Sequence, residues 1–500
     1  MKAPHEVALK VLSSPELEPI VEIVLFSTET GTYEARAVDG AVCFHRRPSK
    51  NGWTFETESV EGRNPLELQD PSRFAPLAAE TRARYPDRTV NSYPFAFEQV
   101  AQVFDHPCAP DLIVVHSTAH SYGENIGQHG SPDVVQARAP FVLAGAGVRK
   151  LGMVDRHCRL IDVAPTVLAL LGIEPGRGTG ANGTEREDVL LSRQDGEPLH
   201  ELLEPGRRPQ HVVAVLADGC NANVLYDMAD SGDAPNVDRL IASGIAFRYG
   251  VMASLPTVTL ANHTSLLTGC HPGHHGILHN AWYDQALQRQ IVTVSASTWQ
   301  EAMRWMNSGI ETIHEALKRA RPQSVTVSVN EPADRGADYS TFELFRQQKV
   351  DLLLPDVSEL PPHTTASFAE SYEPYRWWSL ADAVDLRQAC SIWGGRHLDV
   401  DYPPPAFSWV SFSLTDAAFH AGGPHSEIAR AAVRDTDGRI GDLIVAVERA
   451  GVLEDAAFIL VADHGMEQSD PRVVGDWGDG LRAAGVDFRD ESSGFIYLTR

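Results

Sequence analysis

Short apolar runs alternate with amphipathic segments along most of the chain. In its first part, VEIVLFST at 21–28 and DLIVVHS at 111–117 have the apolar character of strands, whereas FAFEQVAQVF at 95–104 and VAPTVLALLGI at 163–173 have the character of helices. Strands that alternate with helices are typical of α/β domains. The pattern therefore predicts an α/β fold for this part of the chain.

This pattern changes in the stretch 174–209, which is dense in Gly, Pro and charged residues. Such a composition is typical of a linker or an exposed excursion. A second α/β run opens with the strand HVVAVLA at 211–217 and closes near AFILVADHGM at 457–466. Within it, the Trp- and Pro-rich interval at about 285–405 is interpreted as an inserted cap lobe.

The composition is that of a globular protein with an acidic surface. The 500 residues are 43% hydrophobic, which is enough for a large core, and the formal net charge is −25. That charge argues against binding a nucleic-acid polymer or an anionic membrane, so we expect a small partner. No apolar run approaches the roughly 18 residues of a membrane span, and the first residues lack the features of a secretory signal. We therefore expect a cytoplasmic protein.

The stretch VMASLPTVTLANHTSLLTGCHPGHHGILHN at 251–280 is the first candidate for chemistry. Its middle, ANHTSLLTG, is able to begin a helix, and the free N–H groups at a helix start favour an anion. A hydroxyl directly before that start is well placed for phosphoryl transfer, which makes Thr259 the candidate nucleophile. A threonine hydroxyl reacts at neutral pH only with help from a base or a metal ion. The next question is whether the chain supplies metal ligands.

Acidic residues and histidines follow three apolar strands. Asp218 comes after VVAVLA, Asp416 after WVSFSL, and Asp463–His464 after FILVA. Ligands of open α/β sheets bind at the carboxyl ends of the strands, so one shared site is expected. His420 follows Asp416 by four residues, which lets both side chains face one metal ion if the segment is helical. Each signal is weak alone, because an Asp after a strand is more often a turn or capping residue, but their joint occurrence favours a two-metal site.

Four motifs resemble the alkaline phosphatase superfamily, specifically its type I phosphodiesterase/nucleotide pyrophosphatase branch; in chain order they are LADGCNANVL, PTVTLANHTSLLTGCHPGHHGILHN, LTDAAFHAGGP and VADHGM. The resemblance implies an alkaline-phosphatase-like α/β fold, with a central mixed, mostly parallel sheet flanked by helices on both faces. It also implies two zinc ions, or Mn²⁺ or another divalent ion, and a phospho-threonine intermediate on Thr259. Asn280 would help to hold a nonbridging phosphate oxygen. The implied ligands are Asp218, Thr259, Asp463 and His464 for one metal, and Asp416 and His420 for the other.

One ligand of that family is missing from its usual place. The second metal takes a further His from a GTHG-like loop downstream of the DHG motif, but little sequence follows His464. Residues 110–173 resemble the C-terminal portion of the family, with GQHGS in the role of that loop. His129 then becomes the missing ligand.

The order of these motifs predicts a circular permutation. Residues 1–173 would be the C-terminal half of the catalytic domain, 174–209 the linker, and 210–500 the N-terminal half. Permutation is physically tolerable because the termini of domains are commonly exposed and close together. A homodimer in which the halves pair between two chains is the alternative.

Three functions remain open at this point. The first is hydrolysis of phosphodiester or pyrophosphate bonds, and the second is hydrolysis of a phosphonate of the phosphonoacetate type or of a phosphomonoester. The third is a binding protein without catalytic activity. No Lys or Arg occurs between Val251 and Gln288, which favours a diester over a more highly charged substrate. Outside the ligand set, His425 is a candidate contact for phosphate, and Trp377 and Trp378 either stack on a nucleobase or pack the inserted lobe.

Overall fold

The computed structural model describes residues 3–50, 52–80, 92–295, 297–353 and 373–499. Its central feature is an eight-stranded sheet. Five of the seven neighbouring strand pairs in this sheet are parallel, and the two pairs that involve β8 are antiparallel. In spatial order the strands are β20 (Tyr339–Ser340), β19 (Thr326–Val329), β23 (Phe407–Phe412), β14 (His211–Ala217), β24 (Ala456–Val461), β8 (Phe141–Gly145), β15 (Gly244–Phe247) and β9 (Gly152–Val154).

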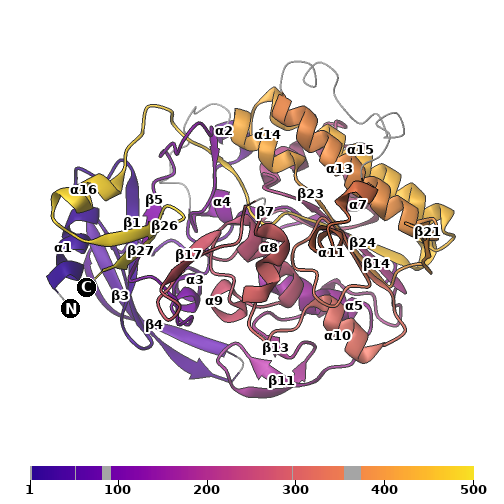
Figure 1. The fold of residues 1–500 in the computed structure, drawn as a ribbon, viewed down its shortest axis with the longest axis horizontal. Helices are drawn as coiled ribbons and strands as arrows, with labels where there is room; N and C mark the ends of the chain where they lie inside the picture. The colour runs from indigo at the N-terminus through magenta and orange to yellow at the C-terminus, as the bar shows by residue number, and fades with distance from the viewer. Residues whose placement is uncertain (1–2, 51, 81–91, 296, 354–372, 500) are drawn as a thin grey trace.

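Helices cover both faces of this sheet, as Figure 1 shows. The central strands are buried along nearly their whole length, which explains their almost uninterrupted apolar sequences. The predicted α/β fold with a mixed, mostly parallel sheet is therefore confirmed. On one face lie α7 (Pro235–Ser243), α13 (Glu373–Trp393), α14 (Leu414–Gly422) and α15 (Glu427–Arg449), and on the other α5 (Val163–Leu170), α8 (Thr259–Thr268) and α10 (Ile313–Ala320).

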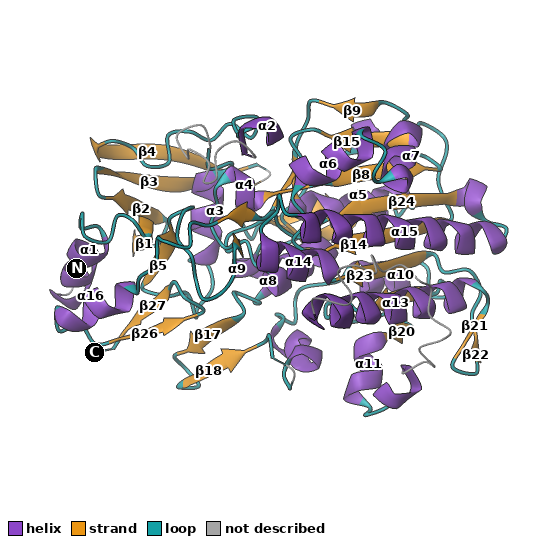
Figure 2. Ribbon diagram, turned by 90° about the horizontal axis from the view of Figure 1, so that it is seen from above, coloured by secondary structure: helices purple, strands orange, loops and turns teal. Residues whose placement is uncertain are grey.

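A second, seven-stranded sheet lies beside the first, as Figure 2 shows. It combines strands from the two ends of the described chain, because β27 pairs with β5 and β5 pairs with β1. The helix α3 (Ala96–Val103) packs against it. In order its strands are β26 (Phe488–Glu491), β27 (Phe495–Leu498), β5 (Leu112–His116), β1 (Val21–Glu29), β2 (Thr32–Ala37), β3 (Gly40–Ser49) and β4 (Gly52–Gly62).

The interval 174–209, expected to be a polar linker, is folded onto the body of the protein. Its strands β11 (Gly176–Gly180), β12 (Glu185–Val189) and β13 (Arg193–Gln194) form a small sheet. Leu190, Leu191 and Leu202 are buried in the main core. Gly, Pro and charged residues outnumber these few buried leucines, so the composition alone indicates a linker.

The interval 285–405, expected to be an inserted cap lobe, contributes directly to the central sheet. It supplies β19 and β20, and its helix α13 packs on α15 and β23. The segment YRWWSLADAV lies within α13, where Trp377 and Trp378 are exposed. Part of the interval, 354–372, lies outside the described residues.

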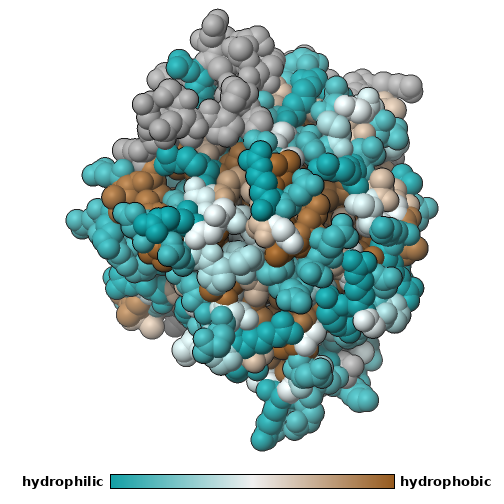
Figure 3. All heavy atoms as spheres, turned by 90° about the vertical axis from the view of Figure 1, so that its right-hand side faces the viewer, coloured by the Kyte–Doolittle hydropathy of each residue, from teal (hydrophilic) through white to brown (hydrophobic). Residues whose placement is uncertain are grey.

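The remaining elements are short and lie around the two sheets. Among the described helices, none combines the length and the apolar character that a bilayer crossing requires. Hydrophilic residues cover most of the face seen in Figure 3.

The short helices and strands around the two sheets are α1 (Ala3–Leu12), α2 (Leu77–Glu80), α4 (Val134–Ala137), α6 (Ala222–Asp230), α9 (Pro272–His275), α11 (Thr341–Arg346), α16 (Trp477–Ala483), β6 (Gly127–Gln128), β7 (Arg138–Ala139), β10 (Cys158–Arg159), β16 (Val251–Met252), β17 (Ala281–Asp284), β18 (Arg289–Val292), β21 (Arg396–His397), β22 (Val400–Asp401) and β25 (Glu467–Gln468).

Candidate active site

Three neighbouring parallel strands bring the predicted acidic residues to one edge of the central sheet. Asp218 directly follows β14, and Asp463 follows β24, the partner of β14 on one side. On the other side, β23 leads into α14, which carries Asp416 and His420. In that helix His420 Nε2 lies 3.4 Å from Asp416 Oδ1, so the i, i+4 spacing places both side chains together.

A glycine makes room for this convergence. Gly219 adopts a φ of +61°, and a Cβ at this position would lie 2.6 Å from Asp416 Oδ1. Its backbone N–H donates a hydrogen bond to Asp463 Oδ1 at 3.0 Å. A residue with a side chain at this position would therefore displace Asp416.

Thr259 is the first residue of α8, whereas the sequence places it directly before the helix start. Its side chain is partly exposed, and its Oγ1 lies 3.5 Å from His464 Nε2. The N–H groups of the first turn of a helix have no partner within the helix, which favours negative charge at this end. A phosphoryl group beside Thr259 would meet these groups.

His129 reaches the same place from a distant part of the sequence. Its ring stacks on that of His464, with 3.8 Å between the ring centroids, and its Nε2 lies 3.2 Å from His420 Nε2. The strand β6, which precedes it, pairs with β25 just after the Asp463–His464 motif. Within a single chain, therefore, the structure places His129 beside the residues of the later motifs.

Two groups of side chains in the described residues are compact enough to hold a metal ion. In each group the ligand atoms lie within 4.8 Å of one another; the groups are His129, Asp416 and His464, and Asp218, His263 and Asp463. This grouping differs from the expected one in two ways. His464 lies with His129 and Asp416, although its Nε2 is also 3.1 Å from Asp463 Oδ2, and His263 joins the two aspartates.

The imidazoles at the site have their Nδ1 atoms occupied. His129 Nδ1 lies 2.8 Å from the carbonyl of Thr257, His420 Nδ1 lies 2.8 Å from that of Gly127, and His464 Nδ1 lies 2.9 Å from its neighbour's carbonyl. A carbonyl only accepts, so each Nδ1 carries the hydrogen. These contacts orient each ring so that its Nε2 faces the site, as in a metal-ligating histidine.

Several polar atoms at the site are buried without a hydrogen-bond partner among the described residues. Buried polar atoms normally have partners, so an unpartnered cluster of acceptors indicates that a cation belongs there. Burial and the neighbouring carboxylates of Asp463 and Asp416 raise the pKa of Asp218 well above its usual range. The donor set of carboxylates and imidazoles suits zinc or a similar divalent ion. The unpartnered atoms are Asp218 Oδ1, His263 Nε2, Asp416 Oδ1 and Asp463 Oδ2.

The sequence did not single out His263 and Glu331. His263 lies one helical turn after Thr259, and its Nε2 is 3.6 Å from Asp463 Oδ2 and 4.0 Å from Asp218 Oδ2. Its Nδ1 lies 2.8 Å from the buried Glu331. The i, i+4 spacing from Thr259 is the one signal that could have identified His263. No local pattern connects it to Glu331.

Two further histidines, His425 and His274, contact acidic residues outside the candidate ligand set. His425, a candidate phosphate contact, lies 3.4 Å from Glu80. His274 lies between Asp195 and Asp105, with nitrogen–oxygen distances of 2.5 and 2.9 Å. It therefore belongs to a polar network with these two carboxylates.

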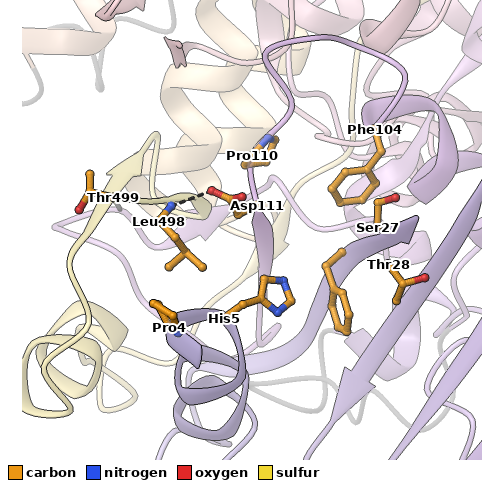
Figure 4. Close-up of a pocket in the computed structure, with 10 residues that line it drawn as sticks. Pro4, His5, Ser27, Thr28, Phe104, Pro110, Asp111, Leu498 and Thr499 are labelled. Carbon is orange, nitrogen blue, oxygen red and sulfur yellow. Dashed lines mark hydrogen bonds between the residues drawn. The ribbon is translucent and has the colours of Figure 1, made fainter. Parts of the chain in front are cut away.

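A cavity of about 360 Å³ opens beside His129 and His420. Asn280 lines it, and its Oδ1 is buried without a partner. A separate cavity of about 440 Å³, drawn in Figure 4, lies near the chain ends, where the Leu498 N–H donates to Asp111 at 2.8 Å. None of the predicted site residues lines that second cavity.

Comparisons with known proteins identify related proteins. The family model for type I phosphodiesterase / nucleotide pyrophosphatase matches residues 212–499. An uncharacterized pyrophosphatase/phosphodiesterase of Schizosaccharomyces pombe is 22% identical over 278 residues, which cover 54% of this chain and 47% of that protein. The bis(5'-adenosyl)-triphosphatase enpp4 of Mus musculus is 24% identical over 262 residues, covering 51% and 47%. The chain thus spans about half the length of these curated relatives.

Solved structures show a more distant likeness. Murine ectonucleotide pyrophosphatase/phosphodiesterase 5 gives a TM-score of 0.41 at 18% identity, covering 58% of this chain and 67% of that one.

Proposed function

Because the chain belongs to the type I phosphodiesterase/nucleotide pyrophosphatase family, we propose that it hydrolyses a phosphodiester or pyrophosphate bond of a small substrate, with Thr259 as nucleophile. The cofactors would be two divalent cations, zinc in the first place and manganese as the alternative. The observation that carries the proposal is the set of unpartnered carboxylate and imidazole atoms next to a hydroxyl at a helix start.

The ligands would be shared between two positions. Asp218, Thr259, Asp463 and His464 would hold one ion, and His129, Asp416 and His420 the other. His263 is a further candidate, since it forms a compact group with Asp218 and Asp463. The ions would lower the pKa of the Thr259 hydroxyl and neutralise the charge of the phosphate. Asn280 would donate its amide to a nonbridging oxygen.

The reaction would proceed in two displacements. The Thr259 oxygen forms a bond to phosphorus while the bond between phosphorus and the leaving oxygen breaks. The hydroxyl proton passes to solvent, and the leaving oxygen takes up a proton. Water then attacks the phospho-threonine, which releases the second product and restores the hydroxyl.

The permutation is part of this proposal. Residues 1–173 would supply the C-terminal half of the catalytic domain and 210–500 the N-terminal half. Two observations support it: the family model matches only from residue 212 onward, and His129 lies beside His464 and His420. The interval 174–209 would join the halves, and a homodimer remains a separate prediction.

The test is turnover of the zinc-loaded protein on an aryl phosphodiester, an aryl phosphomonoester and phosphonoacetate at equal concentration. We expect a clear preference for the diester. Preference for the monoester or for phosphonoacetate would keep the site and replace the substrate class, and absence of turnover on all three would favour a binding protein.

Thr259→Ala should lower turnover of the diester by about three orders of magnitude or more, because the nucleophile is lost. Thr259→Ser is the matched control, since it keeps a hydroxyl and should retain much of the activity. Steady-state kinetics with both variants at equal zinc content checks this. An active Thr259→Ala variant would show that another group is the nucleophile.

A further inference from the structure

We infer that Thr257 is a positioning residue, which sets the place of His129 relative to the nucleophile Thr259. This inference rests on the proposed function, because it concerns how the same site is assembled. It adds to the site a residue that is neither a proposed metal ligand nor the proposed nucleophile.

Thr257 binds three consecutive residues, His129, Gly130 and Ser131, which form the histidine turn. The carbonyl of Thr257 lies 2.8 Å from His129 Nδ1. Its hydroxyl accepts a hydrogen bond from the Gly130 N–H and donates one to the Ser131 carbonyl, each at 2.9 Å. Thr257 is fully buried, so water does not compete for these hydrogen bonds. One residue therefore contacts every residue of the histidine turn.

The histidine turn needs contacts from outside because it contains a glycine in an unusual conformation. Gly130 adopts a φ of +122°, which residues with a side chain rarely occupy. Glycine loses more conformational freedom on folding than any other residue, so an unrestrained turn would populate several conformations. The Thr257 hydroxyl binds the turn on both sides of the Gly130 Cα and favours the conformation in which His129 Nε2 lies 3.2 Å from His420 Nε2.

Thr257 is itself fixed to the helix that begins with the nucleophile. It precedes Thr259, the first residue of α8, by two residues. The side-chain amide of Asn262, also in α8, donates to the carbonyls of Pro256 at 2.9 Å and of Val258 at 3.1 Å. These are the two neighbours of Thr257 in the chain. Because Asn262 is fully buried, the loop before α8 is held firmly to the helix, and Thr257 passes that position on to the histidine turn.

The relative position of these two parts matters for the chemistry. Two cations act on one phosphate only when both are placed correctly, and an error of about 1 Å in placement costs about 100-fold in rate. His129 and Thr259 are far apart in the sequence, so their relative position depends on tertiary contacts. The hydrogen bonds of Thr257 supply a direct one.

The test is the affinity of the full chain for zinc, measured by competition with a chelator. Thr257→Val keeps the size of the side chain and removes the hydroxyl, so both of its hydrogen bonds to the histidine turn are lost. We expect one of the two ions to bind about 10- to 100-fold more weakly and the other to bind as in the wild type. Thr257→Ser, which keeps the hydroxyl, should bind both ions with an affinity close to that of the wild type.

A double substitution identifies the ion that is weakened. His129→Ala should bind one ion, and adding Thr257→Val to it should leave the affinity for that ion unchanged, because the two substitutions act on the same metal position. A general loss of stability would instead weaken the remaining ion as well, and would contradict a positioning role.

Thr166→Val is the matched control, because Thr166 of α5 is also buried and its hydroxyl also holds two backbone groups. This hydroxyl donates to the Asp162 carbonyl at 2.6 Å and accepts from the Leu199 N–H at 2.9 Å. The control loses the same kind of contact and should bind both ions like the wild type. Should a valine variant fail to fold, Thr257→Ala and Thr166→Ala provide the same comparison.

Unchanged affinity for both ions in Thr257→Val would overturn the inference, and so would an equal loss in Thr166→Val. Failure of Thr257→Ser to keep the affinity would overturn it as well. In these three cases the wild type still binds two ions, and the proposed function stands. A wild type that binds fewer than two ions would overturn the two-metal site itself, and the inference with it.

Discussion

At the scale of single residues, Glu331 shows how a group outside the predicted ligand set positions a candidate ligand, His263. It lies against His263 Nδ1, and it accepts hydrogen bonds from the Ser411 hydroxyl at 3.1 Å and from the Ala333 N–H at 2.9 Å. Burial alone would lower the pKa of His263, but the Glu331 carboxylate raises it. The contact fixes the ring so that Nε2 faces Asp218 and Asp463.

Glu331→Gln should weaken zinc binding by about 10- to 100-fold, because the amide holds the His263 ring less firmly. Competition with a chelator measures this affinity directly. Glu448→Gln, at an exposed position of α15, is the control and should bind zinc like the wild type. Equal affinities in all three proteins would mean that Glu331 has only a structural role.

The sequence identified most of the candidate residues that converge at the site. Asp218, Asp416 and Asp463 were found because each follows an apolar strand, and these strands are neighbours in the sheet. Glu331 was missed because it meets His263 only through folding, across 68 residues of sequence. The periodicity of apolar residues predicts local structure and does not reveal a contact between residues so far apart in the sequence.

At the scale of elements, the start of α14 depends on a residue of another helix. Asp382 of α13 accepts hydrogen bonds from the Ser413 N–H at 2.8 Å and the Leu414 N–H at 3.2 Å. These N–H groups are among those that a helix start leaves unpaired. Because α14 carries Asp416 and His420, Asp382 fixes the position of two candidate ligands.

Asp382→Ala should lower the free energy of unfolding by about 1–2 kcal/mol and weaken zinc binding as well. Asp382→Asn keeps one acceptor oxygen, so its free energy of unfolding and its zinc affinity should both fall less than those of Asp382→Ala. Urea unfolding and zinc titration measure the two effects, and the exposed Asp487→Ala serves as control. A loss of stability with unchanged zinc affinity would separate the capping contact from the site.

Long apolar elements were predictable, and short elements were not. The strands around 21–28, 111–117 and 211–217 match β1, β5 and β14 closely, since burial on both faces requires apolar runs. The small sheet within 174–209 escaped prediction because its strands are polar and Gly-rich. Its fold depends on tertiary contacts such as those of Leu190 and Leu191.

At the scale of the whole molecule, a half-buried group of charged side chains links the early part of the chain to the later part. Glu98 of α3 lies 2.9 Å from Arg159 and 3.5 Å from His271, which precedes α9. Burial alone would raise the pKa of Glu98, but Arg159 and His271 together lower it to about 2. Glu98 therefore stabilises the fold while it is ionised.

The pH dependence follows from this lowered pKa. The stabilisation by Glu98 is complete above its unfolded pKa of about 4.5 and is lost as the pH falls toward 2, with a full size on the order of 3 kcal/mol. Glu98→Gln should therefore unfold at a lower temperature than the wild type at pH 7, with a smaller difference at pH 3. Thermal unfolding across this range checks it, and a difference independent of pH would contradict the ion-pair account.

The fold class was predictable from the sequence, but the order and direction of all strands in the central sheet were not. Alternating strands and helices, together with the four motifs, led to a mixed, mostly parallel sheet, which the structure confirms. The insertion of β8 between β24 and β15, antiparallel to both, follows from no sequence pattern. It joins strands that are hundreds of residues apart, and only packing decides such a pairing.

The most direct test of the two-metal site is the number of zinc ions bound per chain in wild type and in His129→Ala. Burial, with the nearby imidazoles of His464 and His420, lowers the pKa of His129 well below its usual range, so the ring is neutral and able to bind a metal. We predict two ions in the wild type and one in the variant, with most diesterase activity lost. Two ions in both proteins, with full activity, would contradict a site shared between the two parts of the chain.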